Sequence, residues 1–404
     1  MKERTVTHLN IIGFRAAVAE IKDKHLCGRP FVIAGATGGR CLALDCSPEA
    51  VRQGVTPGTA LALAERKIKD LLILSPDPPA YDLMNKELEK VAERYAPLWE
   101  NDKQGNLYLD ITGTTSIFGR SVDCSSRILR DIYERLDIRP AVAVASNKLV
   151  SKVATRSIRP MGLIQVLNGT EEDFLSHQDV RLLPGMGKKL LTTAAVVGIK
   201  EIGEIACLSQ SNAIALFGKH GAMLRDMALG IDSTPVVGKN GRQKIVQQAD
   251  FNEDVIDDFV IQGAILSLAE HGGLQMRNEK SGTRNLQLTL VYSDGVEAHG
   301  FEKTKRLLVT DNEIKLTAYN VYKKIANRRI RIRSIKLVFD ELTPLGYQPD
   351  LFEPETEIKE RHLQEALDKI QNRFGAGKIT RGIVLAACSK KAVTPLLNRL
   401  PNKK

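Results

Sequence analysis

The stretch DKQGNLYLDITG, Asp102–Gly113, places strand formers such as Leu107 and Tyr108 after a short polar turn. This order is typical of a β-hairpin whose second strand enters a sheet. The tip of the hairpin holds Gly105 and Asn106, which are small and carry no charge. Because Mg²⁺ binds through anionic oxygens, the residues at this tip supply no acidic ligand for a metal ion.

Two glycine-rich turns have the residue types that a phosphate group needs. Residues 182–189, LLPGMGKK, and residues 216–224, LFGKHGAML, each combine glycines with lysine. The residues concerned are Gly185, Gly187, Lys188 and Lys189 in the first turn, and Gly218, Lys219 and Gly221 in the second. Glycines let the backbone approach an anion, helix-start N–H groups face it, and lysines add charge. The pair of turns favours binding to a DNA backbone, and plain helix caps are the alternative.

Positive charges also interrupt two predicted strands. In RRIRIRSIKL, Arg331 and Arg333 alternate with isoleucines, and the period slips near Ser334. Lys303, Lys305 and Arg306 belong to another predicted strand. Residues two apart share one face of a strand, so a sheet with a basic face could follow a phosphate backbone. An ordinary solvated face is the alternative.

The segment QPDLF lies in a polar, proline-rich stretch that follows Pro344 and is interpreted as a linker. Its apolar residues Leu351 and Phe352, together with Gln348, have no local core to join. Exposed apolar anchors in a polar linker usually insert into a pocket of a partner protein. We therefore predict a docking peptide, with folding back onto the protein as the alternative.

Length and charge limit the classes of protein that are possible. The chain has 404 residues, enough for more than one domain, and 58 Lys and Arg against 48 Asp and Glu give a net charge of +10. A basic balance favours a polyanionic partner, nucleic acid before membrane. The six cysteines show no metal-binding spacing, and no apolar run reaches the roughly 18 residues of a membrane span. The N-terminus is too polar for a signal peptide, so we expect a cytoplasmic protein with reduced thiols and no membrane partner.

The predicted secondary structure divides the chain into parts of different kinds. Hairpins and helices alternate over about the first 165 residues, which predicts an α/β domain with a mostly antiparallel sheet. Residues 170–231 are interpreted as short helices only. Two alternating strands and two helices between residues 243 and 345 predict a small α+β domain, and a last helix precedes a basic tail. The predicted fold class is therefore multidomain, α/β and α+β.

The order of these motifs resembles the Y-family DNA polymerases, the translesion enzymes, over about residues 5–345. The matching stretches are YAPLWE, YLDITG, IFGR, SNKLVSKVA, RPMGL, LLPGMGKK, FGKHG, LGIDSTPV and YSDG. The resemblance implies a right-hand architecture with five parts. These are a palm at residues 1–20 and 75–166, fingers at 21–74, a helix–hairpin–helix thumb at 167–236, a little finger at 243–345, and a clamp-binding linker with a helical tail at 346–404. QPDLF is similar to the pentapeptide that docks on the bacterial sliding clamp, and LQEALDKIQNRFGAGKI is similar to the C-terminal part of the UmuC-like branch.

Members of this family hold two Mg²⁺ ions with three carboxylates, and the resemblance shows where those carboxylates would stand. The family positions are occupied here by Asn10, Ile12, Gly105 and Asn106, all of them neutral. Loss of one electrostatic catalytic group costs on the order of 10²–10³ in rate. Loss of the whole set therefore predicts that no polymerisation is measurable.

Other positions of the family's nucleotide pocket also differ. The aromatic residue that excludes ribose is matched by Arg15, and the Tyr and Arg that grip the triphosphate are matched by Pro48 and Val51. Lys152 and Arg159 remain as a residual phosphate pocket, or as contacts to DNA or solvent. Asp110 is retained and is interpreted as a structural residue of the hairpin.

The resemblance therefore implies a non-catalytic adaptor, similar to the inactive ImuB-type homologues of bacterial mutagenesis cassettes. Its expected partners are primer–template DNA, the bacterial sliding clamp and a separate error-prone polymerase, and no cofactor is expected. The first alternative is an active error-prone DNA polymerase with a displaced Mg²⁺ site near Glu100 and Asp102. The second is a binder of lesions or DNA ends that does not use the clamp.

Overall fold

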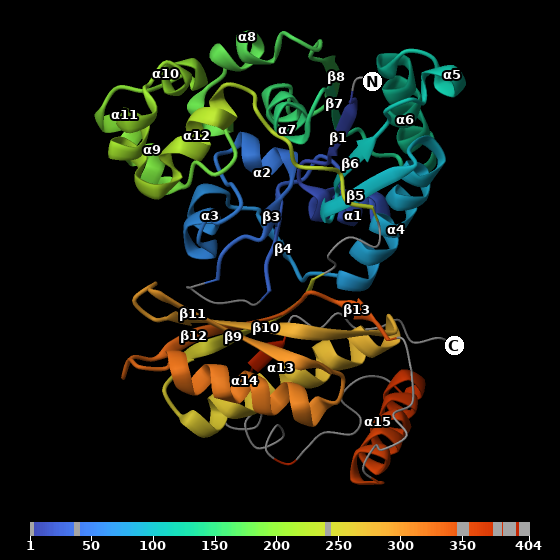
Figure 1. The fold of residues 1–404 in the computed structure, drawn as a ribbon, viewed down its shortest axis with the longest axis vertical. Helices are drawn as coiled ribbons and strands as arrows, with labels where there is room; N and C mark the ends of the chain where they lie inside the picture. Colours follow the sequence, from blue (N-terminus) through green and yellow to red (C-terminus); the bar gives the residue numbers. More distant parts are fainter. Residues whose placement is uncertain are drawn as a thin grey trace. The chain divides into compact units, whose positions relative to one another are not determined.

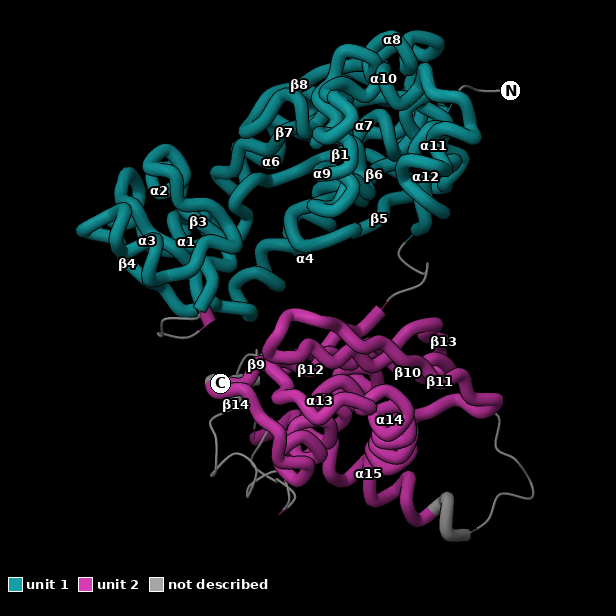
Figure 2. Tube along the Cα trace, turned by 90° about the vertical axis from the view of Figure 1, so that its left-hand side faces the viewer, with its two compact units in different colours: residues 1–34, 38–241 teal, residues 35–37, 242–404 magenta. Residues whose placement is uncertain are grey.

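The computed structural model describes residues 4–35, 41–238, 244–345, 355–374, 382 and 393–395. The chain divides into two compact units (Figure 2). Unit 1 contains residues 1–34 and 38–241, and unit 2 contains residues 35–37 and 242–404. Each unit has its own sheets and its own apolar cores.

A five-stranded sheet lies at the centre of unit 1 (Figure 1). Its strands in spatial order are β5 (Leu98–Lys103), β6 (Asn106–Asp110), β1 (Val6–Asn10), β7 (Ala141–Ala145) and β8 (Gly162–Gln165). β1 is antiparallel to both β6 and β7, and only β7 and β8 run parallel. The mostly antiparallel α/β arrangement predicted for this part of the chain is confirmed.

Helices cover both faces of this sheet. They are α1 (Phe14–Lys22), α4 (Pro78–Tyr95), α5 (Thr115–Phe118), α6 (Ser121–Leu136) and α7 (Lys148–Ser157). Val142 of β7 contributes to a core with Leu88 of α4 and Ile128 of α6, whereas the adjacent Ala143 contributes to a different core with Val153 of α7. Since successive side chains of a strand point to opposite faces, α7 lies on the face opposite α4 and α6.

The predicted fingers contain a small three-stranded sheet. Its elements are η1 (Lys24–Leu26), β2 (Phe31–Ile33), β3 (Asp45–Cys46), α2 (Pro48–Arg52), α3 (Leu61–Lys67) and β4 (Leu72–Leu74). β2 is antiparallel to β3 and parallel to β4. Ser47 caps α2 by accepting the Ala50 N–H, and Pro48 starts the helix, which fits its fixed φ.

The rest of unit 1 is helical, as predicted for residues 170–231. Its elements are α8 (Glu171–Ser176), η2 (Val180–Leu182), α9 (Lys188–Val196), α10 (Ile202–Ala206), α11 (Gln210–Phe217), η3 (Gly218–His220) and α12 (Gly221–Ala228). Leu175, Ile202 and Leu224 of this module share one apolar core with Val150 and Val153 of α7. The helical module is therefore built directly onto α7.

Unit 2 is a sheet covered by helices on one face. Its strands are β9 (Ile245–Val255), β10 (Ser281–Tyr292), β11 (Glu297–Leu308), β12 (Ile332–Asp340), β13 (Thr343–Pro344) and β14 (Val393–Pro395), and its helices are α13 (Asp258–Asn278), α14 (Asp311–Ile325) and α15 (Glu355–Phe374). The spatial order is β11-β10-β12-β9-β14, with β13 paired to β10. The pairing of β12 with β9 shifts register between Ile332 and Ser334, where the sequence predicts a slip. β14 is a strand that the sequence did not predict.

A buried charged cluster attaches α15 to α13 and α14. Arg277 of α13 donates to Asp368 of α15 through Nε (2.6 Å) and Nη2 (2.9 Å), and to Asp311 of α14 through Nη1 (2.9 Å). Gln364 donates to Asp311 (3.1 Å) and Asp368 (3.0 Å). Burial disfavours the charge of Arg277, but the hydrogen bonds and charges of the two aspartates outweigh burial and raise its pKa. The predicted last helix is therefore held on unit 2 by polar contacts.

The sequence also predicts reduced cysteines and no membrane-spanning segment. The five cysteines that the structure describes are all unpaired. In the same described ranges, every helix is too short or too polar to cross a membrane.

Candidate functional site

Asn10 and Asn106, which the sequence predicts to stand at carboxylate positions, face each other across neighbouring strands. Asn10 ends β1 and lies directly opposite Asn106, the first residue of β6. Asn10 is only 4% exposed, and Ile12, just beyond the strand, is 38% exposed. The structure thus brings three of the four predicted positions, including Gly105 beside Asn106, to one end of the sheet.

The turn at Gly105 is closed by an aromatic ring. Gly105 has φ +77°, a left-handed conformation, and a Cβ at this residue would lie 2.6 Å from Cδ2 of Phe14. Its carbonyl accepts the Ile11 N–H at 2.8 Å, and its own N–H donates to Oδ1 of Asn85 at 3.1 Å. A side chain of any kind therefore has no room here unless the Phe14 ring moves.

Helix α4 fixes this turn from the other side. Asn85 is buried on α4, and its Nδ2 donates to Glu89 at 2.9 Å. Gln104, the residue before Gly105, donates to Asp82 at 2.8 Å. Burial raises the pKa of Asp82. The sequence did not identify these contacts, although a polar residue on the apolar face of a helix was a readable signal.

A carboxylate from β3 already occupies the start of helix α1. Oδ2 of Asp45 accepts the N–H groups of Arg15 (2.9 Å) and Ala16 (3.4 Å), and Oδ1 accepts the N–H of Cys46 (3.0 Å). Helix N-termini attract anions, and this one is neutralised internally. Burial raises the pKa of Asp45, against the effect of these hydrogen bonds. Sequence analysis missed this residue because its partner helix is remote in the chain.

The two carboxylates proposed for a displaced metal site are each paired with a lysine. Glu100 accepts two hydrogen bonds from Nζ of Lys148 (2.8 and 2.7 Å), and Asp102 accepts one from Lys152 (2.9 Å). Burial disfavours the charge of Asp102, but its hydrogen bond from Lys152 and the nearby positive charges together outweigh burial and lower its pKa. Both ammonium groups also lie over the ring of Tyr108, at 4.7 and 5.6 Å from its centroid.

The residues at this end of the sheet do not fit a pair of Mg²⁺ ions. The four predicted positions supply no carboxylate, and Glu100 and Asp102 are already matched by ammonium groups. Across the ranges that the structure describes, no group of three or more His, Cys, Asp or Glu side chains is arranged to hold a metal ion. Mg²⁺ needs anionic oxygens to offset its dehydration, and the nucleotide phosphates alone would have to supply them.

A buried histidine lies behind the lysines. His8 of β1 stacks on Tyr108, with ring centroids 4.4 Å apart, and its Nδ1 lies 2.6 Å from Oγ1 of Thr155. Burial, aided by the charge of Lys152, lowers the pKa of His8 to about 3. Burial also raises the pKa of the Tyr108 hydroxyl far above its ordinary value. His8 and Tyr108 are therefore kept neutral beneath the ion pairs of Lys148 and Lys152.

The remaining pocket positions lie where the predicted palm and fingers meet within unit 1. The guanidinium of Arg15 lies 6.0 Å from the ring centroid of Tyr81, and Val51 of α2 is 45% exposed. Pro48 is the first residue of α2. Asp110 accepts the N–H of Thr112 at 2.9 Å, which supports its interpretation as a structural residue of the hairpin.

The two glycine-rich turns of the helical module differ in structure. Gly185 has φ +88°, and Gly187 precedes α9, whose first turn receives no side-chain cap. Lys188 and Lys189 are exposed at the start of that helix. This geometry is the one expected for a turn that offers N–H groups to a phosphate.

The second turn is constrained by packing. Gly218 ends α11 with φ +64°, and Lys219 is exposed. A Cβ at Gly221 would lie 2.0 Å from the carbonyl oxygen of Ala213, so close helix packing alone requires this glycine. The packing explains Gly221 without DNA, and contacts of Gly218 and Lys219 with DNA stay a prediction.

The basic residues of unit 2 that are predicted to contact DNA lie on β11 and near the start of β12. Lys303 and Lys305 alternate with partly buried residues of β11, and Lys303 bonds to Glu341 at 3.0 Å. Arg306 is the next exposed residue of the strand. Arg331 and Arg333 lie at the start of β12, where Arg333 donates to the carbonyl of Ser293 at 2.6 Å and lies 3.6 Å from Asp254. Their contact with DNA stays a prediction.

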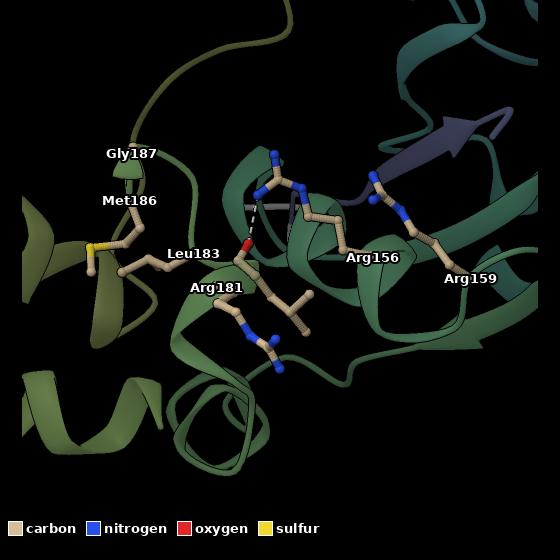
Figure 3. Close-up of a pocket in the computed structure, with 8 residues that line it drawn as sticks. Arg156, Arg159, Arg181, Leu183, Met186 and Gly187 are labelled. Atoms are coloured by element: carbon tan, nitrogen blue, oxygen red, sulfur yellow. Dashed lines mark hydrogen bonds between the residues drawn. The ribbon is translucent and has the colours of Figure 1, made fainter. Parts of the chain in front are cut away.

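The two residues of the predicted residual phosphate pocket have different neighbours. The ammonium group of Lys152 forms an ion pair with Asp102, as described above. Arg159 instead lines a cavity of about 520 Å³, together with Arg156 and residues of the turn at Gly185 (Figure 3). The predicted clamp-binding residues Gln348, Leu351 and Phe352 lie outside the described residues.

Comparison with known proteins gives consistent matches along the chain. Residues 9–156 match the impB/mucB/samB family, and residues 242–351 match the C-terminal domain of that family. The chain is 25% identical over 393 residues to a protein named DNA polymerase IV from Desulfatibacillum aliphaticivorans, covering 96% of this chain and 99% of that protein. It is 27% identical over 378 residues to a DNA polymerase IV from Alkaliphilus oremlandii, covering 90% and 94%.

Solved structures with the same fold are also found. A Y-family DNA polymerase chimera aligns with a TM-score of 0.72 and 20% identity, covering 84% of this chain and 99% of that one. DinB from Sulfolobus solfataricus aligns with a TM-score of 0.62 and 20% identity, covering 83% and 98%. These likenesses confirm the predicted fold class, with palm, thumb and little-finger regions.

The closed turn at Gly105 predicts a specific loss of stability. We expect Gly105→Ala to lower the free energy of unfolding of unit 1 by about 1–3 kcal/mol more than Gly58→Ala, because only the first adds a clash. Gly58 is a matched control, since it has φ +88° and no atom within 4 Å of its added Cβ. Urea unfolding followed by fluorescence of Trp99, the single tryptophan of the chain, measures both losses. Equal losses would contradict the steric explanation.

The buried His8 predicts a dependence of stability on pH. Between its ordinary pKa of 6.5 and its folded value of about 3, only the unfolded chain binds the proton. His8 therefore lowers the stability of unit 1 as the pH falls from 6.5 to 3, by about 1.4 kcal/mol per pH unit at most. The same fluorescence measurement between pH 7 and pH 4 should show a shallower pH dependence for His8→Gln. An unchanged slope in that variant would show that His8 titrates normally in the folded protein.

Proposed function

Because the chain belongs to the Y-family DNA polymerase superfamily, we propose that it is a member that binds primer–template DNA without extending it. The observation that carries this proposal is the turn at Gly105, which Phe14 closes at the place where the family has an acidic metal ligand. The neutral Asn10 and Asn106 opposite each other support the same reading. A carboxylate could not be accommodated at Gly105 without moving the Phe14 ring.

The nucleotide pocket supports this proposal as well. The N–H groups at the start of α1, which could otherwise bind an anion, are taken up by Asp45. The lysines nearest the sheet end are paired with Glu100 and Asp102. An incoming triphosphate would have to break these contacts before it could bind, and each break leaves a partly buried charge unpaired.

The DNA-binding function is proposed to lie in the parts outside this pocket. The turn at Gly185 and Gly187 with Lys188 and Lys189, the second turn at Lys219, and the basic strand residues of unit 2 are the proposed contacts with the backbone. We assign residues 1–20 and 75–166 to the palm, 21–74 to the fingers, 167–236 to the thumb and 243–345 to the little finger. The role that follows is an adaptor of the ImuB type in cytoplasmic translesion synthesis, which serves a separate error-prone polymerase.

The alternative is an active polymerase, which is compatible with relatives that are named DNA polymerase IV. It requires that Glu100 and Asp102 leave Lys148 and Lys152 and bind Mg²⁺ together. The discriminating observation is therefore templated synthesis that depends on these two carboxylates.

Primer extension tests the proposed function directly. We expect the full chain, in excess over primer–template DNA, to add no nucleotide with either Mg²⁺ or Mn²⁺. The same samples should bind that DNA, with an affinity whose logarithm falls linearly with the logarithm of salt concentration. Templated incorporation that disappears in Glu100→Gln or Asp102→Asn would overturn the proposal in favour of the alternative.

Docking on the sliding clamp is proposed for the segment QPDLF, residues 348–352, through Gln348, Leu351 and Phe352. We expect the double replacement Leu351→Ala and Phe352→Ala to abolish binding to the bacterial clamp and to leave affinity for DNA unchanged, because apolar anchors dominate such contacts. Surface plasmon resonance with immobilised clamp measures the first effect and fluorescence anisotropy the second. Clamp binding of equal strength in the double variant would exclude this peptide, and would favour a DNA binder that acts without the clamp.

A further inference from the structure

A cavity of about 520 Å³ lies between palm helix α7 and the first glycine-rich turn of the thumb (Figure 3). Arg156 and Arg159 line it from the end of α7 and the residues just after it. Residues 181–183 and 185–187 line its other side. Both sides belong to unit 1, and they are held together by the core that α7 shares with the helical module.

The arginines of this cavity differ in how their charges are balanced. Arg181 is bonded to Asp179 by its Nε and Nη2, and its side chain points away from the other two in Figure 3. Arg156 donates only to a neutral acceptor, the carbonyl of Leu182, at 2.7 Å. Within the described residues, Arg159 has no hydrogen-bond or ion-pair partner. The cavity thus holds two guanidinium groups without a bonded carboxylate.

The surroundings lower the pKa values of these two arginines. Burial lowers the pKa of Arg156, although the charges of Tyr108 and Asp102 act in the opposite direction. Partial burial also lowers the pKa of Arg159, and the positive charge of Arg156 adds to the effect. Two positive charges beside a cavity attract an anion. Water in the same place compensates these charges less well.

The backbone on the other side of the cavity adds hydrogen-bond donors. Gly187 lines the cavity and is the N-cap of α9, but it offers no side chain to accept the N–H groups of the first turn. Arg156 holds this turn in place through its bond to Leu182. A guanidinium group binds a phosphate through two parallel hydrogen bonds, and a helix start adds N–H groups and a favourable dipole.

We propose that Arg156, Arg159 and the turn at Leu183–Gly187 form a pocket that binds one phosphate group of DNA. This inference rests on the proposed DNA-binding function and adds a specific anchor to it. The phosphate is either an internal phosphodiester or a terminal 5′-phosphate, since both present the anionic oxygens that a guanidinium recognises. Arg159 is the principal ligand, because its guanidinium is uncommitted.

Arg159→Gln and Arg181→Gln form a matched pair of variants for the test. Both residues line the same cavity, and each variant removes one positive charge, but only Arg159 lacks a carboxylate partner. The full chain is titrated with fluorescent duplex DNA at several salt concentrations, with and without a 5′-phosphate on its end. Arg159→Lys is included because it keeps the charge and loses the two-pronged geometry.

We expect Arg159→Gln to weaken DNA binding about fivefold to tenfold and to reduce the slope against salt by about one released ion. Arg181→Gln should change affinity less than twofold, and Arg159→Lys should recover part of the loss. A loss that occurs only with 5′-phosphorylated DNA identifies a terminal phosphate, and a loss with both DNAs identifies an internal one.

The pocket would be overturned if Arg159→Gln bound DNA as well as the wild type, or if both glutamine variants weakened binding equally. Either outcome would leave the proposed DNA-binding function intact. Failure of the wild-type chain to bind either DNA would instead reject the proposed function itself. Circular dichroism of each variant at the assay temperature confirms that it is folded. Because the side chain of Arg159 makes no hydrogen bond or ion pair within the described part of the protein, its replacement should not disturb folding.

Discussion

The contact between the Phe14 ring and the backbone of Gly105 determines what the central sheet of unit 1 can do. The ring lies where a side chain at residue 105 would begin, so the hairpin can enter the sheet only with a glycine at its tip. Hydrogen bonds from Ile11 and to Asn85 then hold the turn in place. A close-packed interior does not yield to one extra carbon atom without a cost in stability. The absence of a carboxylate is thus part of the packing of this protein and not an isolated change of residue type.

The charged groups at the same end of the sheet are also satisfied by contacts within the protein. The carboxylates and lysines nearby neutralise each other as the pairs of Glu100 with Lys148 and Asp102 with Lys152. Asp45 does the same for the dipole of α1. This internal pairing is the physical basis of our proposal that the chain binds DNA without extending it.

Much of the fold could be predicted from the sequence, because the signals were local. Helix α2 begins at the Ser-Pro pair of residues 47 and 48, α4 ends before Pro97, and β12 shifts register near Ser334, all as their patterns predict. The order of motifs also identified the fold class. The contacts that close the pocket could not be predicted, because Asp45 and Asn85 act on segments far away in the chain. The different neighbours of Lys152 and Arg159 could not be predicted for the same reason, since they come from β5 and from residues 181–187.

The charged cluster around Arg277 has a consequence for how far a bound protein could be from unit 2. The cluster fixes α15 on one side of the segment 346–354, and the pairing of β13 with β10 fixes the other side. Nine residues reach at most roughly 32 Å when fully stretched. A protein that bound this segment would accordingly stay close to unit 2, because the elements on both sides of the segment are packed in that unit.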